Sequence, residues 1–360
     1  MGTIAGIAVR MHATFLLLLV FVGWQHWLQG RSVAAVLEGV VFILVLFGCV
    51  VLHEFGHALT ARRFGITTRD ITLLPIGGVA RLERMPDDPV QELWVALAGP
   101  AVNVVIALAL AAWLASSGAL VPITEIDVAR GPFLERLLYV NVLLVGFNLL
   151  PAFPMDGGRV LRALLATRME YTRATQVAAT LGQSMAFFFG FLGIVGNPLL
   201  LFIALFVWLG ASQEASMVQI RSALAGIPVS RAMITEFRSV APGDTLATVV
   251  DLLLDGAQQD FPVVDGGRMV GIVLGRDLSS ALQQRGPDGR VDDVMRRDAP
   301  TVDGRDMLEP VFRRLSTTGS PVAAVERDGR MVGLVTLDNV GEFLMVQSSL
   351  ASHDRRGRPV

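Results

Sequence analysis

The sequence contains no lysine, and all 30 of its basic residues are arginine. We attribute this bias to codon usage in a GC-rich genome rather than to a binding site. The net charge is −2 and no basic stripe is present, so the composition does not indicate nucleic-acid binding. Cys49 is the only cysteine, which excludes an intramolecular disulfide.

Charge is also scarce along much of the chain, of which 52% is hydrophobic. Residues 39–52 carry no charged side chain, and long apolar runs fill residues 12–217, whereas 218–360 resemble an ordinary soluble domain. Because a helix needs about 20 apolar residues to cross a bilayer, we predict six membrane spans. They cover residues 12–28, 37–60, 93–116, 134–152, 174–195 and 198–217. The first has no clear small-residue cleavage site, so we expect it to remain uncleaved.

Arginine counts in the connections between these spans predict their orientation. The 61–92 connection has five arginines and the 153–173 connection has four, whereas Arg31 and Arg130 stand alone in the connections on the opposite side. The arginine-rich connections should therefore face the cytoplasm. Six spans then place both termini and the C-terminal half in the cytoplasm of a bacterial or archaeal cell, with the chain in its inner membrane.

The predicted second span ends in the motif His53-Glu54-Phe-Gly-His57. Histidines four residues apart lie on one face of a helix, one turn apart. This spacing suits two imidazole ligands of one Zn²⁺, and Glu54 is placed to take a proton from water activated by the metal. The lone Cys49 shares this face, but we interpret it as a packing residue.

A carboxylate occurs at a matching depth at the end of the fourth span. Pro151 and Pro154 should break or unwind that helix, and Asp156 follows directly. Ionisable residues at membrane depth are costly and are usually functional. We therefore predict Asp156 as a third ligand, with a water in the fourth position; the alternative is an aspartate that only caps a helix or turn.

Three other features are placed to serve the same site. Asn148 is about two turns before Asp156 and could donate to an oxyanion. Gly99, Pro100 and Asn103 form a small-residue stretch that allows close helix packing. Residues 71–82, with Gly77 and Gly78 at the turn, predict two strands whose edge could pair with an unwound substrate. Both asparagines could instead bridge helices.

Together these motifs resemble the site-2 protease family, in the residues His53-Glu54-Phe-Gly-His57, Pro75-Ile-Gly77-Gly78, Gly99-Pro100-x-x-Asn103 and Asn148-Leu-Leu-Pro151-x-x-Pro154-Met-Asp156-Gly157. The family consists of zinc metalloproteases that cut substrates within or beside transmembrane helices. The resemblance implies zinc on His53, His57 and Asp156, with Glu54 as base and acid and Asn148 at the oxyanion. It also implies that Gly77, Gly78 and Asn103 contact the substrate. Met155 stands where the family usually has leucine, a swap that conserves volume.

The C-terminal half contains an internal repeat with an offset of 62 residues. Val229-Ser-Arg-Ala-Met233 matches Val291-Asp-Asp-Val-Met295, and Gly267-Arg-Met-Val-Gly271 matches Gly329-Arg-Met-Val-Gly333. Each copy predicts a helix (245–255 and 306–315), two strands and a final helix. This α/β pattern resembles a CBS-domain pair, a module that often binds adenine nucleotides between its repeats. The family's ribose-binding aspartate corresponds to Asp277 and Asp338; its hydroxyl residue is present as Thr336, but Gly275 replaces it in the first copy.

We therefore predict a polytopic α-helical membrane protease domain at 1–217, a linker at 218–228, CBS repeats at 229–285 and 286–347, and a mobile tail at 348–360. Expected partners are a membrane-tethered substrate such as an anti-sigma or transcription factor, membrane lipid, an adenine nucleotide and a second copy through the CBS pair. Two other hypotheses remain: a channel or transporter gated by the CBS pair, and an inactive scaffold. The intact Glu54 and the clustering of polar groups on two spans disfavour both.

Overall fold

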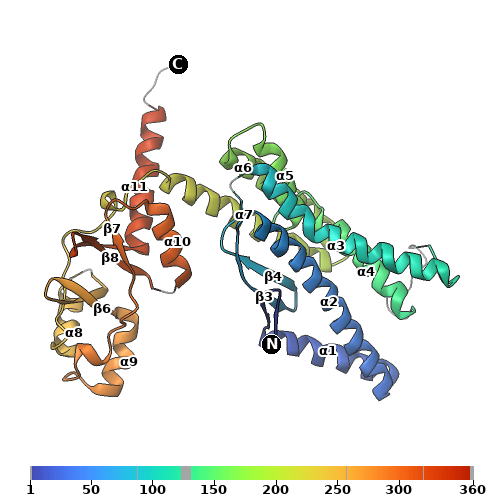
Figure 1. The fold of residues 1–360 in the computed structure, drawn as a ribbon, viewed down its shortest axis with the longest axis horizontal. Helices are drawn as coiled ribbons and strands as arrows, with labels where there is room; N and C mark the ends of the chain where they lie inside the picture. Colours follow the sequence, from blue (N-terminus) through green and yellow to red (C-terminus); the bar gives the residue numbers. More distant parts are fainter. Residues whose placement is uncertain (1, 87, 123–130, 257, 319, 357–360) are drawn as a thin grey trace. The chain divides into compact units, whose positions relative to one another are not determined.

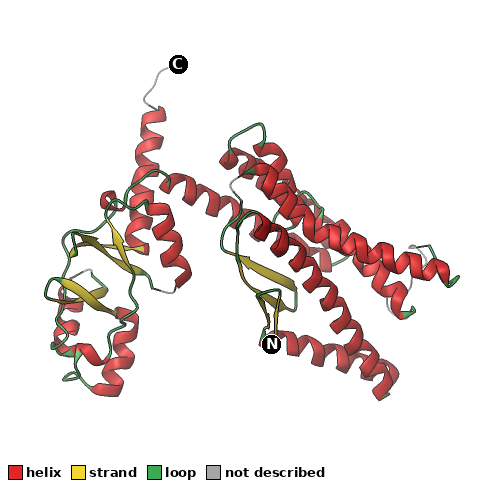
Figure 2. Ribbon diagram, viewed as in Figure 1, coloured by secondary structure: helices red, strands yellow, loops and turns green. Residues whose placement is uncertain are grey.

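The computed structural model describes residues 2–86, 88–122, 131–256, 258–318 and 320–356. These residues divide into two compact units, Met1–Val218 and Gln219–Val360. The first is mainly helical with a small sheet, and the second is a mixed α/β unit (Figures 1 and 2).

All six predicted spans are helical: α1 (Ala13–Gly30), α2 (Val33–Arg63), α3 (Pro89–Ser116), α4 (Phe133–Asn148), α6 (Tyr171–Val195) and α7 (Leu199–Leu224). Among the described residues, four helices are long and apolar enough to cross a membrane, namely α2, α3, α6 and α7. The predicted count of six is therefore met only in part. In the predicted 117–133 connection, residues 123–130, including Arg130, lie outside the described part of the chain.

A small sheet packs against α2 in the first unit (Figure 1). Its described strands have the order β1-β2-β3-β4, with β1 at Gly2–Ile4, β2 at Ile7–Met11, β3 at Thr68–Leu74 and β4 at Gly77–Leu82. The predicted strand pair in 71–82 is thus confirmed as β3 and β4, which pair antiparallel. The parallel pairing of β2 with β3 joins the first eleven residues to this pair and was not predicted. In this order β4 is an edge strand.

The chain between α4 and α6 positions Asp156. Helix α4 ends at Asn148, ahead of Pro151 and Pro154, as the two prolines predict. A short helix, α5 (Asp156–Ala166), then begins at Asp156 itself. A Cβ on Gly157 would meet the carbonyl oxygens of Leu149 and Leu150, so only glycine lets α5 start this close to the preceding segment.

The second unit confirms the repeated elements. The first copy has α8 (Leu246–Asp255), β5 (Asp260–Asp265), β6 (Arg268–Leu274) and α9 (Gly275–Arg285). The second has β7 (Thr301–Asp303), α10 (Leu308–Thr318), β8 (Val322–Arg327), β9 (Arg330–Thr336) and α11 (Leu337–Arg356). Helix α11 therefore includes residues 348–356 of the predicted tail, and 357–360 lie outside the described residues.

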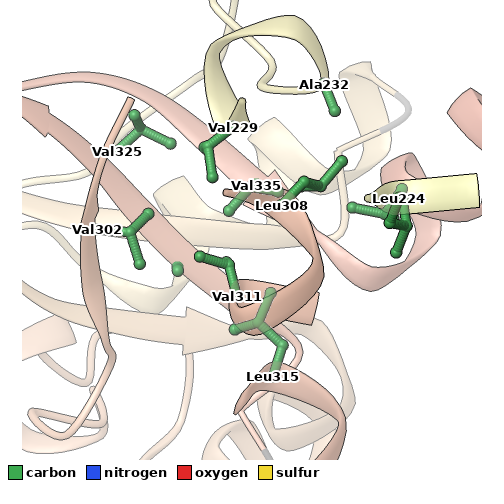
Figure 3. Packing of buried hydrophobic residues seen from close by; sticks show 11 residues of the cluster. Leu224, Val229, Ala232, Val302, Leu308, Val311, Leu315, Val325 and Val335 are labelled. Carbon is green, nitrogen blue, oxygen red and sulfur yellow. The ribbon is translucent and has the colours of Figure 1, made fainter. Parts of the chain in front are cut away.

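The segment that leads into each copy packs on the other copy. Ile234, in the segment before α8 of the first copy, exchanges backbone hydrogen bonds with Leu334 of β9. Arg296, in the segment before β7 of the second copy, does so with Ile272 of β6. Figure 3 shows Leu224 and Val229 among the buried side chains of the second copy, including Val302 and Val335. Each of the two cores thus combines residues from both halves of the repeat.

Candidate metal centre

Three ligand atoms from two distant segments converge in the first unit. The Nε2 atoms of His53 and His57 lie 3.1 Å apart, and Asp156 Oδ2 lies 3.2 Å from the first and 3.1 Å from the second. All three residues are buried. A tetrahedral zinc ion with bonds of about 2.0–2.1 Å separates its ligand atoms by about 3.3 Å, so this triangle has the dimensions that the ion requires.

Hydrogen bonds on the far side of each imidazole select the tautomer that can bind a metal. His57 Nδ1 lies 2.7 Å from the carbonyl oxygen of Val95, and His53 Nδ1 lies 2.5 Å from Asn103 Oδ1. A carbonyl oxygen only accepts, so Nδ1 of His57 donates and its Nε2 keeps a free lone pair. Such partners behind ligating histidines also fix the orientation of the rings.

The orientation of the Asn103 amide is fixed in turn. Asn103 Nδ2 donates to Asn141 Oδ1 at 2.9 Å, and Asn141 Nδ2 donates to the carbonyl oxygen of Leu137 at 2.8 Å. Because this chain ends on an acceptor, Asn103 Oδ1 is the atom that faces His53. His53 therefore has the same tautomer as His57, with Nε2 free toward Asp156.

Gly99 on α3 leaves the space in front of the imidazoles open. A Cβ at this position would fall on His57 Nε2 and lie 2.6 Å from His53 Nε2. Any side chain would displace the two ligand atoms, which explains the need for glycine in the predicted small-residue stretch. The donor set, its triangle and this clearance all fit a zinc ion.

Asp156 Oδ2 faces the Nε2 atoms of both histidines, and Arg159 Nη1, one turn along α5, lies 3.8 Å from Asp156 Oδ1. Because each imidazole has its proton on Nδ1, the two Nε2 atoms and Asp156 Oδ2 present lone pairs to the same space. This is the arrangement that ligands of one cation require.

Glu54 borders both the ligands and the free edge of the sheet. Its Oε2 accepts a hydrogen bond of 3.1 Å from the backbone N–H of Ala80 in β4. That N–H points away from β3, so Glu54 lies on the unpaired side of the edge strand. A Cβ on Gly78 would come within 2.8 Å of Glu54 Cγ, so glycine permits this approach.

The other predicted residues lie in several places. Gly77, with a φ of 140°, is the first residue of β4. Asn103 is 0% exposed and holds His53, and the substrate contact expected of it stays a prediction. Asn148 ends α4. Among the described residues, no hydrogen bond joins Asn148 to the ligands, so its catalytic role also stays a prediction.

In the second unit the two predicted aspartates occupy equivalent places, Asp277 in the first turn of α9 and Asp338 in the first turn of α11. Ahead of α9, Asp260 Oδ1 accepts a hydrogen bond of 3.0 Å from the backbone N–H of Gly275, and burial raises the pKa of Asp260. Arg296 donates to Asp277 at 2.8 Å. Thr336 accepts from the backbone N–H of Asn339 at the start of α11.

Several residues behind the ligands were not identified from the sequence. Val95 acts through its backbone carbonyl, for which the sequence carries no signal. Glu92 and Glu214 form ion pairs with the fully buried Arg162. Glu214 lies inside the predicted 198–217 span, where an isolated ionisable residue is itself an indication of function. Glu92 and Arg162 belong to the predicted 61–92 and 153–173 connections, where charged residues are ordinary.

Comparison with known proteins agrees with this geometry. The family model for peptidase family M50 matches residues 41–129 and 119–189, and the CBS-domain model matches 229–284 and 291–345. A zinc metalloprotease of Methanocaldococcus jannaschii is 33% identical over 340 residues, which cover 94% of this chain and 93% of its own. The zinc metalloprotease Rip3 of Mycobacterium tuberculosis is 30% identical over 376 residues, which cover 96% of this chain and 92% of Rip3.

Among solved structures, the site-2 protease from Methanocaldococcus jannaschii matches at 37% identity with a TM-score of 0.45, over 60% of this chain and 94% of that one. The sequence matches extend across both units, and the catalytic motifs lie inside the matched region. The chain therefore belongs to peptidase family M50, the site-2 protease family, and carries a CBS-domain pair in its C-terminal half.

Proposed function

We propose that the chain is a zinc metalloprotease that hydrolyses peptide bonds within or beside the transmembrane segments of membrane-tethered substrates. The observation that carries this proposal is the metal triangle with Glu54 beside it, on the unpaired edge of β4. Its substrates would be membrane-tethered regulators such as anti-sigma or transcription factors. A transporter would need a polar path through several spans, whereas the buried His53, His57 and Asp156 here converge on one small site.

Each side chain has a defined task in this reaction. His53, His57 and Asp156 would hold the ion through Nε2, Nε2 and Oδ2. Zinc held there would supply the Lewis acidity that polarises a peptide carbonyl and makes water nucleophilic near neutral pH. Glu54 takes the proton from the attacking water and returns it to the leaving amine. Asn148 is proposed to donate to the developing oxyanion.

The edge of β4 is the proposed substrate guide. A membrane helix satisfies its backbone internally, so a substrate must unwind before its carbonyl can be reached. An unwound segment could pair with the free edge of β4 by strand addition. Gly78 keeps this edge close to Glu54, and the positive φ of Gly77 allows the turn that starts β4, so a paired substrate backbone would lie next to the proton-transfer group.

The proposed topology has six spans, adding α1 and α4 to the four helices that meet the length and composition requirement. Helices α1 and α4 have 18 and 16 residues, near the lower limit for a crossing. The arginine-rich connections after α2 and before α6 support an orientation with the metal centre toward the cytoplasmic face. The CBS pair would then be cytoplasmic, in the inner membrane of a bacterium or archaeon.

Chelation should abolish the activity. We expect the purified full chain to contain about one zinc per chain by elemental analysis. A zinc chelator should reduce cleavage of a tagged membrane-tethered substrate to background, and added Zn²⁺ should restore it, because the imidazoles and Asp156 alone cannot activate water. Cleavage that persists in the metal-free chain would contradict the proposed function.

The CBS pair is proposed to bind an adenine nucleotide and to mediate a homodimer. Asp338→Ala should weaken nucleotide binding by about 10- to 100-fold, the effect of losing a hydrogen bond to a charged group. Asp277→Ala should have a smaller effect, because Gly275 lacks the hydroxyl that Thr336 supplies in the second copy. Calorimetry with ATP, ADP, AMP and S-adenosylmethionine measures this, with Asp251→Ala on α8 as control. No heat with any of them would contradict nucleotide binding.

A further inference from the structure

The guanidinium group of Arg162 is buried on α5, six residues after Asp156. Its Nε and Nη2 donate to Glu92 Oε1 at 2.8 and 2.5 Å, and its Nη1 donates to Glu214 Oε1. Arg162 is 0% exposed, and its Cζ lies 5.0 Å from the ring centroids of both Phe153 and Tyr171. A charge this deeply buried is retained only with close partners, and here two helices supply them.

These ion pairs determine where α5 lies. Glu92 belongs to α3 and Glu214 to α7, so Arg162 ties α5 to both helices. Asp156 is the first residue of α5 and follows a segment without helical structure, and no side chain caps the start of the helix. The position of the Asp156 carboxylate therefore depends on the position of α5 as a whole.

One face of α3 helps to position all three predicted zinc ligands. Asn103 orients His53, the Val95 carbonyl orients His57, and Gly99 makes room for both rings. Glu92 holds Arg162 and through it the helix that carries Asp156. Positions 92, 95, 99 and 103 are spaced by three, four and four residues, which places them on one face of a helix.

We propose that Arg162 is a positioning residue for the metal centre: its ion pairs with Glu92 and Glu214 hold Asp156 in register with the two histidines on α2. This role rests on the proposed zinc function. The alternative is an ion cluster that only stabilises the fold. The two differ in whether loss of Arg162 weakens zinc binding more than loss of another buried arginine does.

Arg136 provides the matched control in the same unit. It is also buried, with an ion pair of 3.3 Å to Glu38 and its Cζ 4.2 Å from the Phe42 ring centroid. Arg136→Met thus removes the same group from a similar setting without touching α5. Arg162→Lys keeps the positive charge but loses the planar guanidinium group, which donates to two carboxylates at once.

The test is zinc affinity of the detergent-solubilised full chain, measured by competition with a chelator. Arg162→Met should weaken Zn²⁺ binding at least about tenfold, in the range seen when groups that support metal ligands are removed. Arg162→Lys and Glu214→Gln should give intermediate losses, and Arg136→Met should bind as wild type does. Excess Zn²⁺ should restore cleavage by Arg162→Met, which loss of fold alone would not allow.

Wild-type zinc affinity in a folded Arg162→Met chain would overturn the positioning role and leave the proposed function intact. If that variant does not fold, unchanged affinity in both Arg162→Lys and Glu214→Gln overturns it instead. An equal loss of affinity in Arg136→Met would assign the effect to general destabilisation. A wild-type chain that binds no zinc would overturn the proposed function, and the positioning role with it.

Discussion

Glu54→Gln is expected to lower the rate of substrate cleavage by about 10²–10⁴-fold while zinc stays bound, the usual contribution of a general acid–base group. Glutamine has the shape of glutamate and can still accept the hydrogen bond from Ala80, so the sheet should keep its place. It cannot take a proton from water. Co-expression of a tagged membrane-tethered substrate with either chain, followed by quantification of the cleaved fragment, measures the effect.

Glu38→Gln is the control for this experiment, because Glu38 lies on the same helix and its side chain is 58% exposed. This variant should cleave as the wild type does. Equal cleavage by the Glu54→Gln and wild-type chains would eliminate Glu54 as the proton carrier. It would also revive the hypothesis that the chain is an inactive scaffold and that another protease makes the cut.

Asp156→Asn is expected to abolish stoichiometric zinc binding and, with it, all detectable cleavage. The amide removes the negative charge and presents a much weaker ligand to a site that otherwise has only neutral imidazoles. Elemental analysis of the purified variant gives the zinc content directly. The same variant tests the alternative that Asp156 only caps or starts a helix. If that alternative holds, the Asp156→Asn chain should still bind zinc.

Asp88→Asn is the control for an aspartate that only caps a helix. Asp88 caps α3, where its Oδ1 accepts hydrogen bonds from the backbone N–H groups of Val90 and Gln91. Asparagine is an equally good cap, so this variant should retain zinc and activity. Retention of zinc by the Asp156→Asn chain would remove Asp156 from the proposed ligand set.

Local patterns were enough to predict much of the centre. The spacing of His53 and His57 is a property of one helix, and the two prolines before Asp156 predict where α4 ends. The structure brings their ligand atoms together across 99 and 103 residues of sequence. The likeness of the copies around Gly267 and Gly329 likewise predicted the repeated strands of the second unit.

What could not be predicted depends on contacts between distant segments. The parallel pairing of Ala8 with Asp70 has no short-range signal in either strand. The support from Val95 uses a backbone atom, which every residue possesses. Arg162 has the sequence context of an exposed connection, and only the approach of Glu92 and Glu214 shows why it is buried. These residues support the zinc ligands without belonging to any of the motifs that the sequence analysis identified.

The exchange of leading segments between the CBS copies has a consequence for how such a pair could originate. Because Ile234 completes the sheet of the second copy and Arg296 extends that of the first, neither copy closes its own core. A chain with a single copy would have to take this segment from a second molecule, so we expect such a chain to be stable only as a segment-swapped dimer. Gene duplication would convert that association into a contact within one chain, independent of protein concentration.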